Sequence, residues 1–304
     1  MARVAVLLST YNGEDYLSQQ IDSILNQTIV DDITLFIRDD GSTDNTRKIL
    51  EKYKNSFPNK INIFLGENIG LNFSFFWLIH NVDGFDFYSI CDQDDVWLNN
   101  KIEIAVEMLK KEDNSIPLLY ASSSFLVHND LIPYGETRKK NREITIYNSL
   151  IQNFSPGHSQ VFNDKLHELL NCDFNVTNIY VYDSWILNEA ILFGKLIFDN
   201  NSHTFYRQHD DNQLGSGKSN FQKLLLSKKR INKGHGKKYR QQIEYFNDYN
   251  SLKMKDIGAY DYVKKFVSKK NFFTRFAFSM SGRFYRQKKI ETFAFYLAYI
   301  FGKF

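Results

Sequence analysis

The chain has 304 residues, of which 43% are hydrophobic and 24% are charged, and its formal net charge is +3 at pH 7. This length and apolar content fit one large domain, or one domain with an appendage. No apolar run reaches the about 18 to 20 residues of a membrane-spanning helix. The two cysteines, Cys91 and Cys172, form no recognisable disulfide framework, and the opening apolar run at 4–8 is too short for a signal peptide. We therefore expect a cytoplasmic protein.

The charge is divided unevenly along the chain. Residues 1–218 contain 18 Lys and Arg against 30 Asp and Glu, a net charge of −12, whereas residues 219–304 contain 20 against 5, a net charge of +15. A strongly basic region is typical of contact with an anionic partner such as a membrane, a nucleic acid or an acidic surface. We expect a body of residues 1–217 and a basic C-terminal region of residues 218–304.

In chain order, apolar runs alternate with amphipathic stretches from the N-terminus to Val127. The expected strands are residues 4–8, 33–37, 61–65, 85–91 and 118–127. Helices are expected between them, at about 14–25, 43–54, 72–81 and 98–111. Continuous apolar runs are typical of strands buried on both faces, and the alternation predicts an α/β fold with a mainly parallel sheet.

The rest of the chain is less regular. Residues 128–147 and 153–158 have the polar, turn-rich composition of loops; helices are expected at 164–170 and 183–193, with short strands at 195–198 and 203–207. The stretch Gly215-Ser216-Gly217-Lys218-Ser219 lacks the earlier glycine and the strand of a P-loop, so we interpret it as a hinge. The basic region beyond it is expected to be helical.

Three expected strands end in polar clusters. These are Ser9 to Asn12, Asp39-Asp40, and Asp92-Gln93-Asp94-Asp95. Ligands of open α/β sheets bind beyond the carboxyl ends of the strands, and closely spaced carboxylates favour a divalent cation among them. A solvated loop with Asp95 capping the next helix is the structural alternative.

These motifs resemble those of inverting family 2 glycosyltransferases with the nucleotide-diphospho-sugar transferase fold, called GT-A. The resemblance extends from the N-terminus to about Lys110 and rests on five segments in order: 6–12, 23–28, 38–44, 68–70 and 92–97. The sequence Cys-Asp-Gln-Asp-Asp-Val-Trp is similar to that of bacterial rhamnosyltransferase-like members. The resemblance implies a metal, Mn²⁺ or Mg²⁺, and a nucleotide-diphosphate sugar donor, a UDP- or dTDP-sugar.

The resemblance also implies residue roles in the first half of the chain. Ser9, Tyr11, Asp40 and Asn68 would bind the donor, with Asp40 accepting a hydrogen bond from a pyrimidine ring. Asp92 would contact both nucleotide and metal, and Asp94, as the last residue of the Asp-x-Asp motif, would be the stronger metal ligand.

Two later segments complete the expected site. Tyr182-Asp183-Ser184-Trp185 resembles the family's acidic site, in which Asp183 would be the catalytic base; an N-cap is the structural alternative. Tyr206-Arg207-Gln208-His209 resembles the segment that closes over the diphosphate, where Arg207 would pair with phosphate and His209 would complete the metal shell, although a lone histidine is often structural.

The basic region combines Lys and Arg with many Phe and Tyr. This composition suits an interfacial helix on anionic lipid, at the inner face of the cell membrane; packing in a homo-oligomer or on the body is the alternative. No nucleic-acid-binding module is recognisable.

The sequence thus predicts a metal-dependent inverting glycosyltransferase of bacterial surface glycan synthesis, acting on a glycan, lipid-linked or protein-linked acceptor. The alternatives are a nucleotidyltransferase of similar topology and a non-catalytic scaffold with a partner-binding tail. The first lacks its glycine-rich basic loop after strand one, and donor hydrolysis would separate the second from an enzyme.

Overall fold

The protein divides into two compact units, which we describe separately. The structure is a computed structural model that describes residues 2–29, 32–137, 139–208 and 235–304. The first unit comprises residues 1–139, 155–172 and 193–217; the second comprises residues 140–154, 173–192 and 218–304. Two segments that precede residue 217 therefore belong with the basic C-terminal region. His209, the stretch 215–219 and the start of the basic region up to residue 234 lie outside the described residues.

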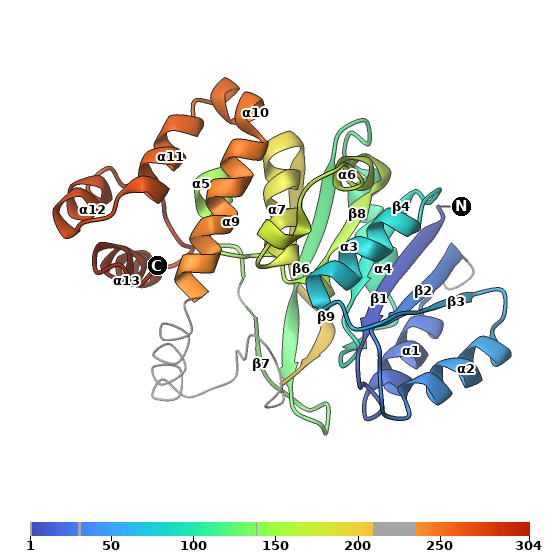
Figure 1. The fold of residues 1–304 in the computed structure, drawn as a ribbon. Coiled ribbons are helices and arrows are strands. Elements are labelled where there is room, and N and C mark those ends of the chain that lie inside the picture. The colour runs from blue at the N-terminus through green and yellow to red at the C-terminus, as the bar shows by residue number, and fades with distance from the viewer. Residues whose placement is uncertain (1, 30–31, 138, 209–234) are drawn as a thin grey trace. The chain divides into compact units, whose positions relative to one another are not determined.

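The first unit is built on one mixed sheet flanked by helices (Figure 1). Its strand order is β3-β2-β1-β4-β8-β6-β9-β5, with β7 paired to β6. The first four strands of that order are parallel and are β1 (Val4–Thr10), β2 (Ile33–Asp39), β3 (Ile61–Leu65) and β4 (Phe87–Cys91). These are the four apolar runs expected first in the chain, and the α/β prediction is confirmed.

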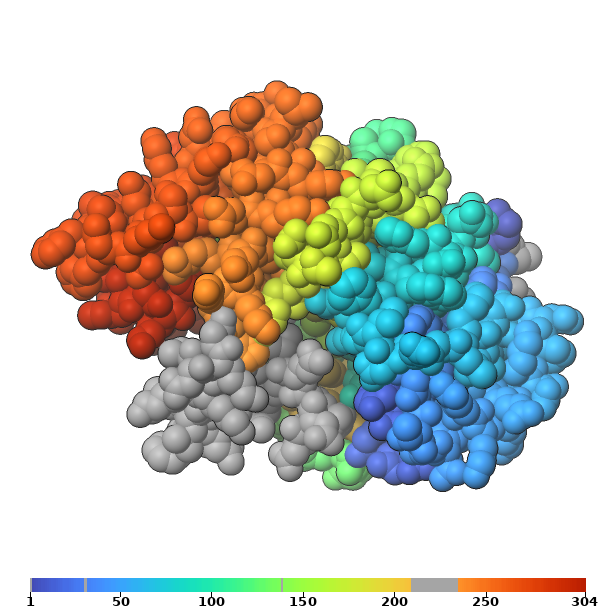
Figure 2. Space-filling view, viewed as in Figure 1, coloured from blue at the N-terminus to red at the C-terminus, as the bar shows by residue number. Residues whose placement is uncertain are grey.

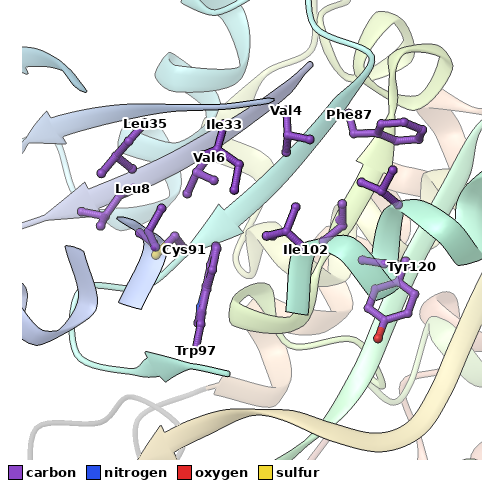
Figure 3. Packing of buried hydrophobic residues seen from close by; sticks show 14 of the residues in the cluster. Val4, Val6, Leu8, Ile33, Leu35, Phe87, Cys91, Trp97, Ile102 and Tyr120 are labelled. Carbon is purple, nitrogen blue, oxygen red and sulfur yellow. The ribbon is translucent and has the colours of Figure 1, made fainter. Parts of the chain in front are cut away.

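The parallel strands form because their apolar side chains are covered on both faces. Every residue of β1 and of β4 is buried. Figure 3 shows Val4, Val6 and Leu8 of β1 in one layer with Ile33 and Leu35 of β2. Strands that are buried on both faces hold their ends in fixed places, and these ends carry the polar clusters.

The other half of the sheet contains antiparallel pairs. It comprises β5 (Val96–Trp97), β6 (Leu118–Val127), β7 (Pro133–Glu136), β8 (Val161–Asn163) and β9 (Lys195–Arg207). The predicted strand 118–127 is confirmed. The two short strands predicted at 195–198 and 203–207 are one strand, β9, whose register with β6 shifts near Ser122 and Ser123. The expected loop 128–147 contains β7, which residue pattern alone did not indicate because that strand is short and exposed.

Helices of the first unit follow the predicted positions to within a few residues. They are α1 (Leu17–Leu25), α2 (Thr46–Ser56), α3 (Leu71–Asn81), α4 (Lys101–Lys110) and α6 (Asp164–Leu170), with a 3₁₀ turn, η2 (Gly157–Ser159). The structural alternative in which Asp95 caps the following helix is wrong, because α4 begins at Lys101 and its N-cap position is Asn100.

The second unit is helical. It comprises α5 (Ile146–Ser149), the turn η3 (Val176–Asn178), most of α7 (Tyr182–Phe193), α9 (His235–Tyr249), α10 (Ser251–Asp256), α11 (Tyr260–Ser268), α12 (Phe272–Ser279) and α13 (Lys289–Ile300). Trp185 of α7 is fully buried, with its ring near those of Tyr245 and Phe246 of α9. Within the described ranges, every helix is too short or too polar to cross a membrane.

Candidate active site

The three polar clusters follow neighbouring strands. In the parallel registers, Thr10 of β1 lies beside Asp39 of β2, and Leu8 lies beside Cys91 of β4. The backbone N–H of Asp40 donates to the carbonyl of Thr10 at 2.8 Å. The residues after these three strands therefore meet at one edge of the sheet, as the sequence predicted.

Gln93, the middle residue of the Asp-Gln-Asp motif, joins the acidic loop to the end of β1. Its side-chain carbonyl accepts from the Thr10 hydroxyl at 2.6 Å and from the Tyr11 backbone N–H at 2.9 Å, and its amide donates to the Tyr11 carbonyl at 3.2 Å. Three hydrogen bonds to one side chain fix the acidic loop against β1. This clamp lies outside the roles that the sequence assigned.

Asp92, Asp95 and His158 converge in the acidic loop region. One potential ligand atom from each lies within 4.8 Å of the other two. His158 Nδ1 is 4.0 Å from Asp92 Oδ2 and 3.8 Å from Asp95 Oδ2. Asp94 is not a member of this group, although it lies between two residues of the same loop.

Asp95 is a fully buried carboxylate in an acidic environment. Burial raises its pKa well above the ordinary range, and the charges of Asp94 and Asp92 raise it further. Asp95 Oδ1 accepts from the backbone N–H of Arg207 at 3.1 Å, whereas Oδ2 has no hydrogen-bond partner among the described residues. A buried acceptor without a donor is costly, so this atom is suited to a proton or a cation.

His158 presents its other nitrogen to these carboxylates. Burial, followed by the charge of Lys101, lowers the pKa of its imidazole to about 3, so the ring is neutral near pH 7. Its Nε2 is 2.9 Å from the Ser124 hydroxyl. If Nε2 carries the proton, the lone pair of Nδ1 faces Asp92 and Asp95, as in metal-ligating histidines.

Sequence reasoning placed His158 in a turn and assigned it no role. The ring comes from η2, which lies far beyond Asp92 in the chain, and only the tertiary structure brings the two together. A single histidine in a Pro-Gly-His turn has no spacing pattern that marks a ligand. No signal in the sequence alone would have selected it.

Lys101 is a second residue that the sequence did not single out. Its ammonium donates to the His158 carbonyl at 2.8 Å and lies 3.3 Å from the centre of a Trp97 ring. Burial lowers the pKa of this lysine to about 7. Lys101 thus anchors the turn that carries His158 and places positive charge near the acidic loop.

These side chains fit a divalent cation. Two carboxylates and a neutral imidazole are ligands that Mn²⁺ accepts, and Asp95 Oδ2 is a buried acceptor that a cation would satisfy. The expected ligand His209 lies outside the described residues, and Asp94 remains a prediction.

Arg207 is buried beneath the acidic loop. Its guanidinium donates to the Asp94 carbonyl at 2.8 Å, to the Asn129 carbonyl at 3.2 Å and to the Gln19 side-chain oxygen at 2.6 Å. In this arrangement it holds the backbone of the loop, and none of these three partners is a ligand. Its expected contact with phosphate therefore remains a prediction.

Asp40 is tied to the loop after β3. Its oxygens accept from the backbone N–H groups of Ile69 and Gly70, both at 2.9 Å, and from the guanidinium of Arg38. The neighbouring Asp39 has one oxygen, Oδ1, without a hydrogen-bond partner in the described part of the chain. The geometry thus gives Asp39 a spare acceptor that the sequence did not assign.

The other expected donor-binding residues lie at the same strand ends. Ser9 is buried, and its hydroxyl is 2.6 Å from that of Ser74. Tyr11 and Asn68 are exposed in the loops after β1 and β3. Their positions are compatible with contact to a ligand beyond the sheet edge.

Asp183 belongs to the second unit. It is the second residue of α7 and is buried, and one carboxylate oxygen accepts from the Ser184 backbone N–H at 2.8 Å. The Ser184 hydroxyl in turn is 2.8 Å from that of Tyr239, for which burial raises the pKa to about 12. These contacts hold the start of α7, where the Asp183 carboxylate lies.

Known proteins with the same features identify the family. The family model Glycosyl transferase family 2 matches residues 5–169. The chain is 30% identical over 253 residues to the dTDP-rhamnosyl transferase RfbG of Shigella flexneri, covering 78% of this chain and 82% of that protein. It is 29% identical over 163 residues to the Escherichia coli UDP-Glc:alpha-D-GlcNAc-diphosphoundecaprenol beta-1,3-glucosyltransferase WfgD, covering 53% of this chain and 60% of that protein.

A solved structure shares the fold. The mannosyltransferase PcManGT from Pyrobaculum calidifontis, in complex with GDP-Man and Mn²⁺, superposes with a TM-score of 0.58 at 15% identity, covering 99% of this chain and 86% of that one. This likeness, the acidic strand ends and the matching sequence motifs agree. The chain therefore belongs to glycosyl transferase family 2 and has the GT-A fold.

Proposed function

We propose that this glycosyltransferase moves a sugar from a nucleotide-diphosphate donor to an acceptor hydroxyl, with inversion at the anomeric carbon and with the help of a divalent cation. The observation that carries the proposal is the convergence of His158, from η2, with Asp92 and Asp95 of the loop that follows the parallel strand β4. Open α/β sheets bind their ligands at such strand ends.

The acidic loop would hold Mn²⁺ or Mg²⁺. Asp92, Asp95 and His158 supply a suitable donor set, and the family resemblance adds Asp94 and His209. When bound, the cation would offset the negative charge that develops on the leaving diphosphate. The chain's own part is to keep these ligands in place: Gln93 and Arg207 hold the acidic loop through hydrogen bonds, and Lys101 holds the turn of His158. The hydrogen bonds of Gln93 to Thr10 and Tyr11 fix the distance between the acidic loop and the end of β1.

The nucleoside would lie beyond the ends of β1 and β2. We assign its binding to Ser9, Tyr11, Asp40 and Asn68. Since both Asp40 oxygens already accept hydrogen bonds, Asp39 Oδ1 is a further acceptor for a ring N–H. A carboxylate that recognises a base N–H discriminates against bases that lack this donor.

Asp183 would act as the general base. Its carboxylate takes the proton of the acceptor hydroxyl while that oxygen forms a bond to the anomeric carbon, and the bond from that carbon to the diphosphate oxygen breaks on the opposite face. The electron pair leaves with the nucleoside diphosphate. Inversion follows because this is a single displacement.

Relatives of the chain suggest the substrates. Two relatives are named for a dTDP-rhamnosyl transfer and for a glucosyl transfer to a diphosphoundecaprenol-linked sugar. We propose a UDP- or dTDP-sugar donor and a lipid-linked glycan acceptor of bacterial surface polysaccharide synthesis, with a protein-linked glycan as the alternative. The protein would work in the cytoplasm at the membrane's inner face. A homo-oligomer formed through the C-terminal region is the alternative arrangement.

The test is donor turnover by the purified full-length protein. Release of nucleoside diphosphate would be measured with dTDP-rhamnose, UDP-glucose and GDP-mannose, each with Mn²⁺, with Mg²⁺ and with a chelator. We expect release from a UDP- or dTDP-sugar that stops with the chelator and returns when Mn²⁺ is added. Turnover that is equally fast in the chelator would overturn the metal-dependent mechanism.

A further inference from the structure

Helices α12 and α13 present apolar side chains to solvent. Phe273 of α12 is 80% exposed, and Ile290 and Phe293 of α13 are 76% and 65% exposed. Large exposed apolar side chains occur singly on most proteins, but a contiguous group marks an interaction surface. We call the following residues the outer face: Phe272, Phe273, Phe276, Met280, Ile290, Phe293, Leu297 and Phe301.

The outer face follows helical periodicity. On α13 the exposed residues Ile290, Phe293 and Leu297 recur at three- and four-residue spacing, which places them on one side. Phe295 and Tyr299 occupy the other side and are buried. Helix α13 is therefore apolar on both sides, and only one of them is covered by the rest of the second unit.

The two helices bring their exposed side chains together. The rings of Phe272 on α12 and Phe301, just after α13, lie 5.7 Å apart, and Phe272 also stacks on Phe276 at 6.4 Å. Helices α12 and α13 lie side by side in the ribbon (Figure 1), and both form part of the surface in the space-filling view (Figure 2). The outer face is thus one patch made by two helices.

Basic residues are frequent in the part of the chain that contains this patch. Residues 262–304 contain ten Lys and Arg and one acidic residue, Glu291, a net charge of +9. Lys288 and Lys289 are exposed at the start of α13, Lys270 is exposed just before α12, and Lys303 is exposed near the chain end. Exposed apolar side chains with exposed lysines near the helix ends suit an anionic bilayer, in which apolar chains lie beneath acidic headgroups.

We propose that the outer face docks on the surface of an anionic lipid bilayer, with its Phe, Leu, Ile and Met side chains inserted at the level of the headgroups. Helix α12 has 8 residues and α13 has 12, which at about 1.5 Å per residue is less than the roughly 30 Å of a bilayer core. The two helices therefore lie along the bilayer surface and do not cross it.

A second copy of the chain fits the outer face less well. A symmetric contact would place the same patch of each copy against the other, and with it two regions of net charge +9. Repulsion between like charges opposes that contact, whereas acidic headgroups attract the same residues. The inference concerns the second unit alone and does not depend on the sugar-transfer reaction.

The experiment is sedimentation of the full-length protein with vesicles. Vesicles of phosphatidylcholine and phosphatidylglycerol in equal parts are compared with vesicles of phosphatidylcholine alone, at about 0.1 M and about 0.5 M NaCl. The variant is Phe273→Ser with Phe293→Ser. Its control is Leu252→Ser on α10, which removes a side chain that is 79% exposed and lies outside the outer face.

We expect the wild type and the Leu252→Ser control to sediment with the phosphatidylglycerol vesicles at low salt. Binding should weaken at high salt, and the double variant should lose at least about 10-fold in its partition coefficient, because two inserted rings are gone. Equal partitioning of the double variant and the control would overturn the proposal. So would a wild type that ignores vesicles and forms a dimer, if light scattering shows that the double variant is a monomer.

Donor turnover in the same preparations, without vesicles, separates this proposal from the proposed function. The substituted residues have no part in the proposed chemistry, so turnover should equal that of the wild type. Vesicle binding can then be judged even if no tested donor is consumed.

Discussion

Two buried carboxylic acids, one in each unit, differ in the ligand atoms around them. Asp95 of the first unit has Asp92 and Asp94 as loop neighbours and an imidazole nitrogen 3.8 Å away. Glu189, on α7 of the second unit, accepts from the Asn250 side-chain amide at 2.9 Å, and burial raises its pKa to about 8. Burial raises the pKa of both acids, but only Asp95 has further potential ligand atoms around it.

The difference shows what burial alone can and cannot indicate. Glu189 Oε2, like Asp95 Oδ2, has no hydrogen-bond partner among the described residues, but no further ligand atom is grouped with it there, so a proton is enough to keep this acid neutral. Protonation of Asp95 would leave Asp92 and His158 Nδ1 still facing each other as acceptors. A cation satisfies all three at once. The comparison therefore separates a structural acid from a binding site, and the variants below test that separation.

The largest effect is expected for the proposed base in the second unit. Asp183→Asn removes the proton acceptor but keeps the hydrogen bond from the Ser184 N–H. Transfer to an acceptor should fall by about 10²- to 10⁴-fold while the donor dissociation constant stays near that of the wild type. The measurement is single-turnover transfer beside a donor titration, with Asp256→Asn, an exposed acid on α10, as the control. An equal loss of donor affinity and rate would assign Asp183 to donor binding or to structure.

The next effect tests the acidic loop. Asp94→Asn and Asp95→Asn should each lower donor turnover by about 10²- to 10³-fold and raise the Mn²⁺ concentration needed for half-maximal turnover. Asp95 does not cap α4, so the milder effect that a capping role implies is not expected for it. The exposed Asp113 provides a matched control, Asp113→Asn, with unchanged turnover. If Asp95→Asn keeps full activity and the same Mn²⁺ requirement, Asp95 is a structural acid like Glu189 and does not bind the cation.

The smallest effect on activity is expected for Glu189→Gln. The folded-state pKa of about 8 lies above the ordinary value of 4.5, so the protein must keep a proton on Glu189 that the unfolded chain releases above about pH 4.5. Stability is therefore full below that pH and is lost as pH rises towards about 8. Glutamine stays neutral, so Glu189→Gln should raise the free energy of unfolding at pH 8 by on the order of 3 kcal/mol, with little change at pH 4.5.

Thermal unfolding of wild type and Glu189→Gln between pH 4.5 and 8 provides the measurement. Donor turnover should be the same for both proteins. A wild type whose stability relative to the variant does not change with pH would show that Glu189 is not held in its neutral form.

Much of the first unit was predictable because its strands are continuous apolar runs. The four parallel strands and the helix at 164–170 were predicted at or near their observed ends, and their order placed the polar clusters at one sheet edge. Strands β5, β7 and β8 were not predicted. They have two to four residues, and β5 and β8 depend on pairing with distant segments, so the local pattern contains little of what forms them. Strand β7 pairs with the nearby β6 but is short and exposed.

The site was predictable only as far as it is local. The strand-end residues Asp92, Asp40 and Ser9 were named from motifs, whereas His158 and Lys101 act through contacts between segments that are distant in the chain. The outer face was predicted only as a composition, a basic and aromatic region suited to anionic lipid, and not as a defined set of side chains. Periodicity shows that a helix has an apolar side, but it does not show whether anything covers that side. Helix α13 has two apolar sides, and only one of them is covered.

The second unit is assembled from three separate segments of the chain, and this determines the order in which its parts can fold. Helix α7 and residues 140–154 are synthesised well before the helices that cover them: the Val181 backbone N–H bonds to Gln242, 61 residues later, and the Ile151 carbonyl accepts from Arg286, 135 residues later. Contacts so distant in the chain form late. During synthesis Trp185 therefore stays uncovered until α9 has left the ribosome. Exposed apolar surface in this interval favours aggregation of the nascent chain.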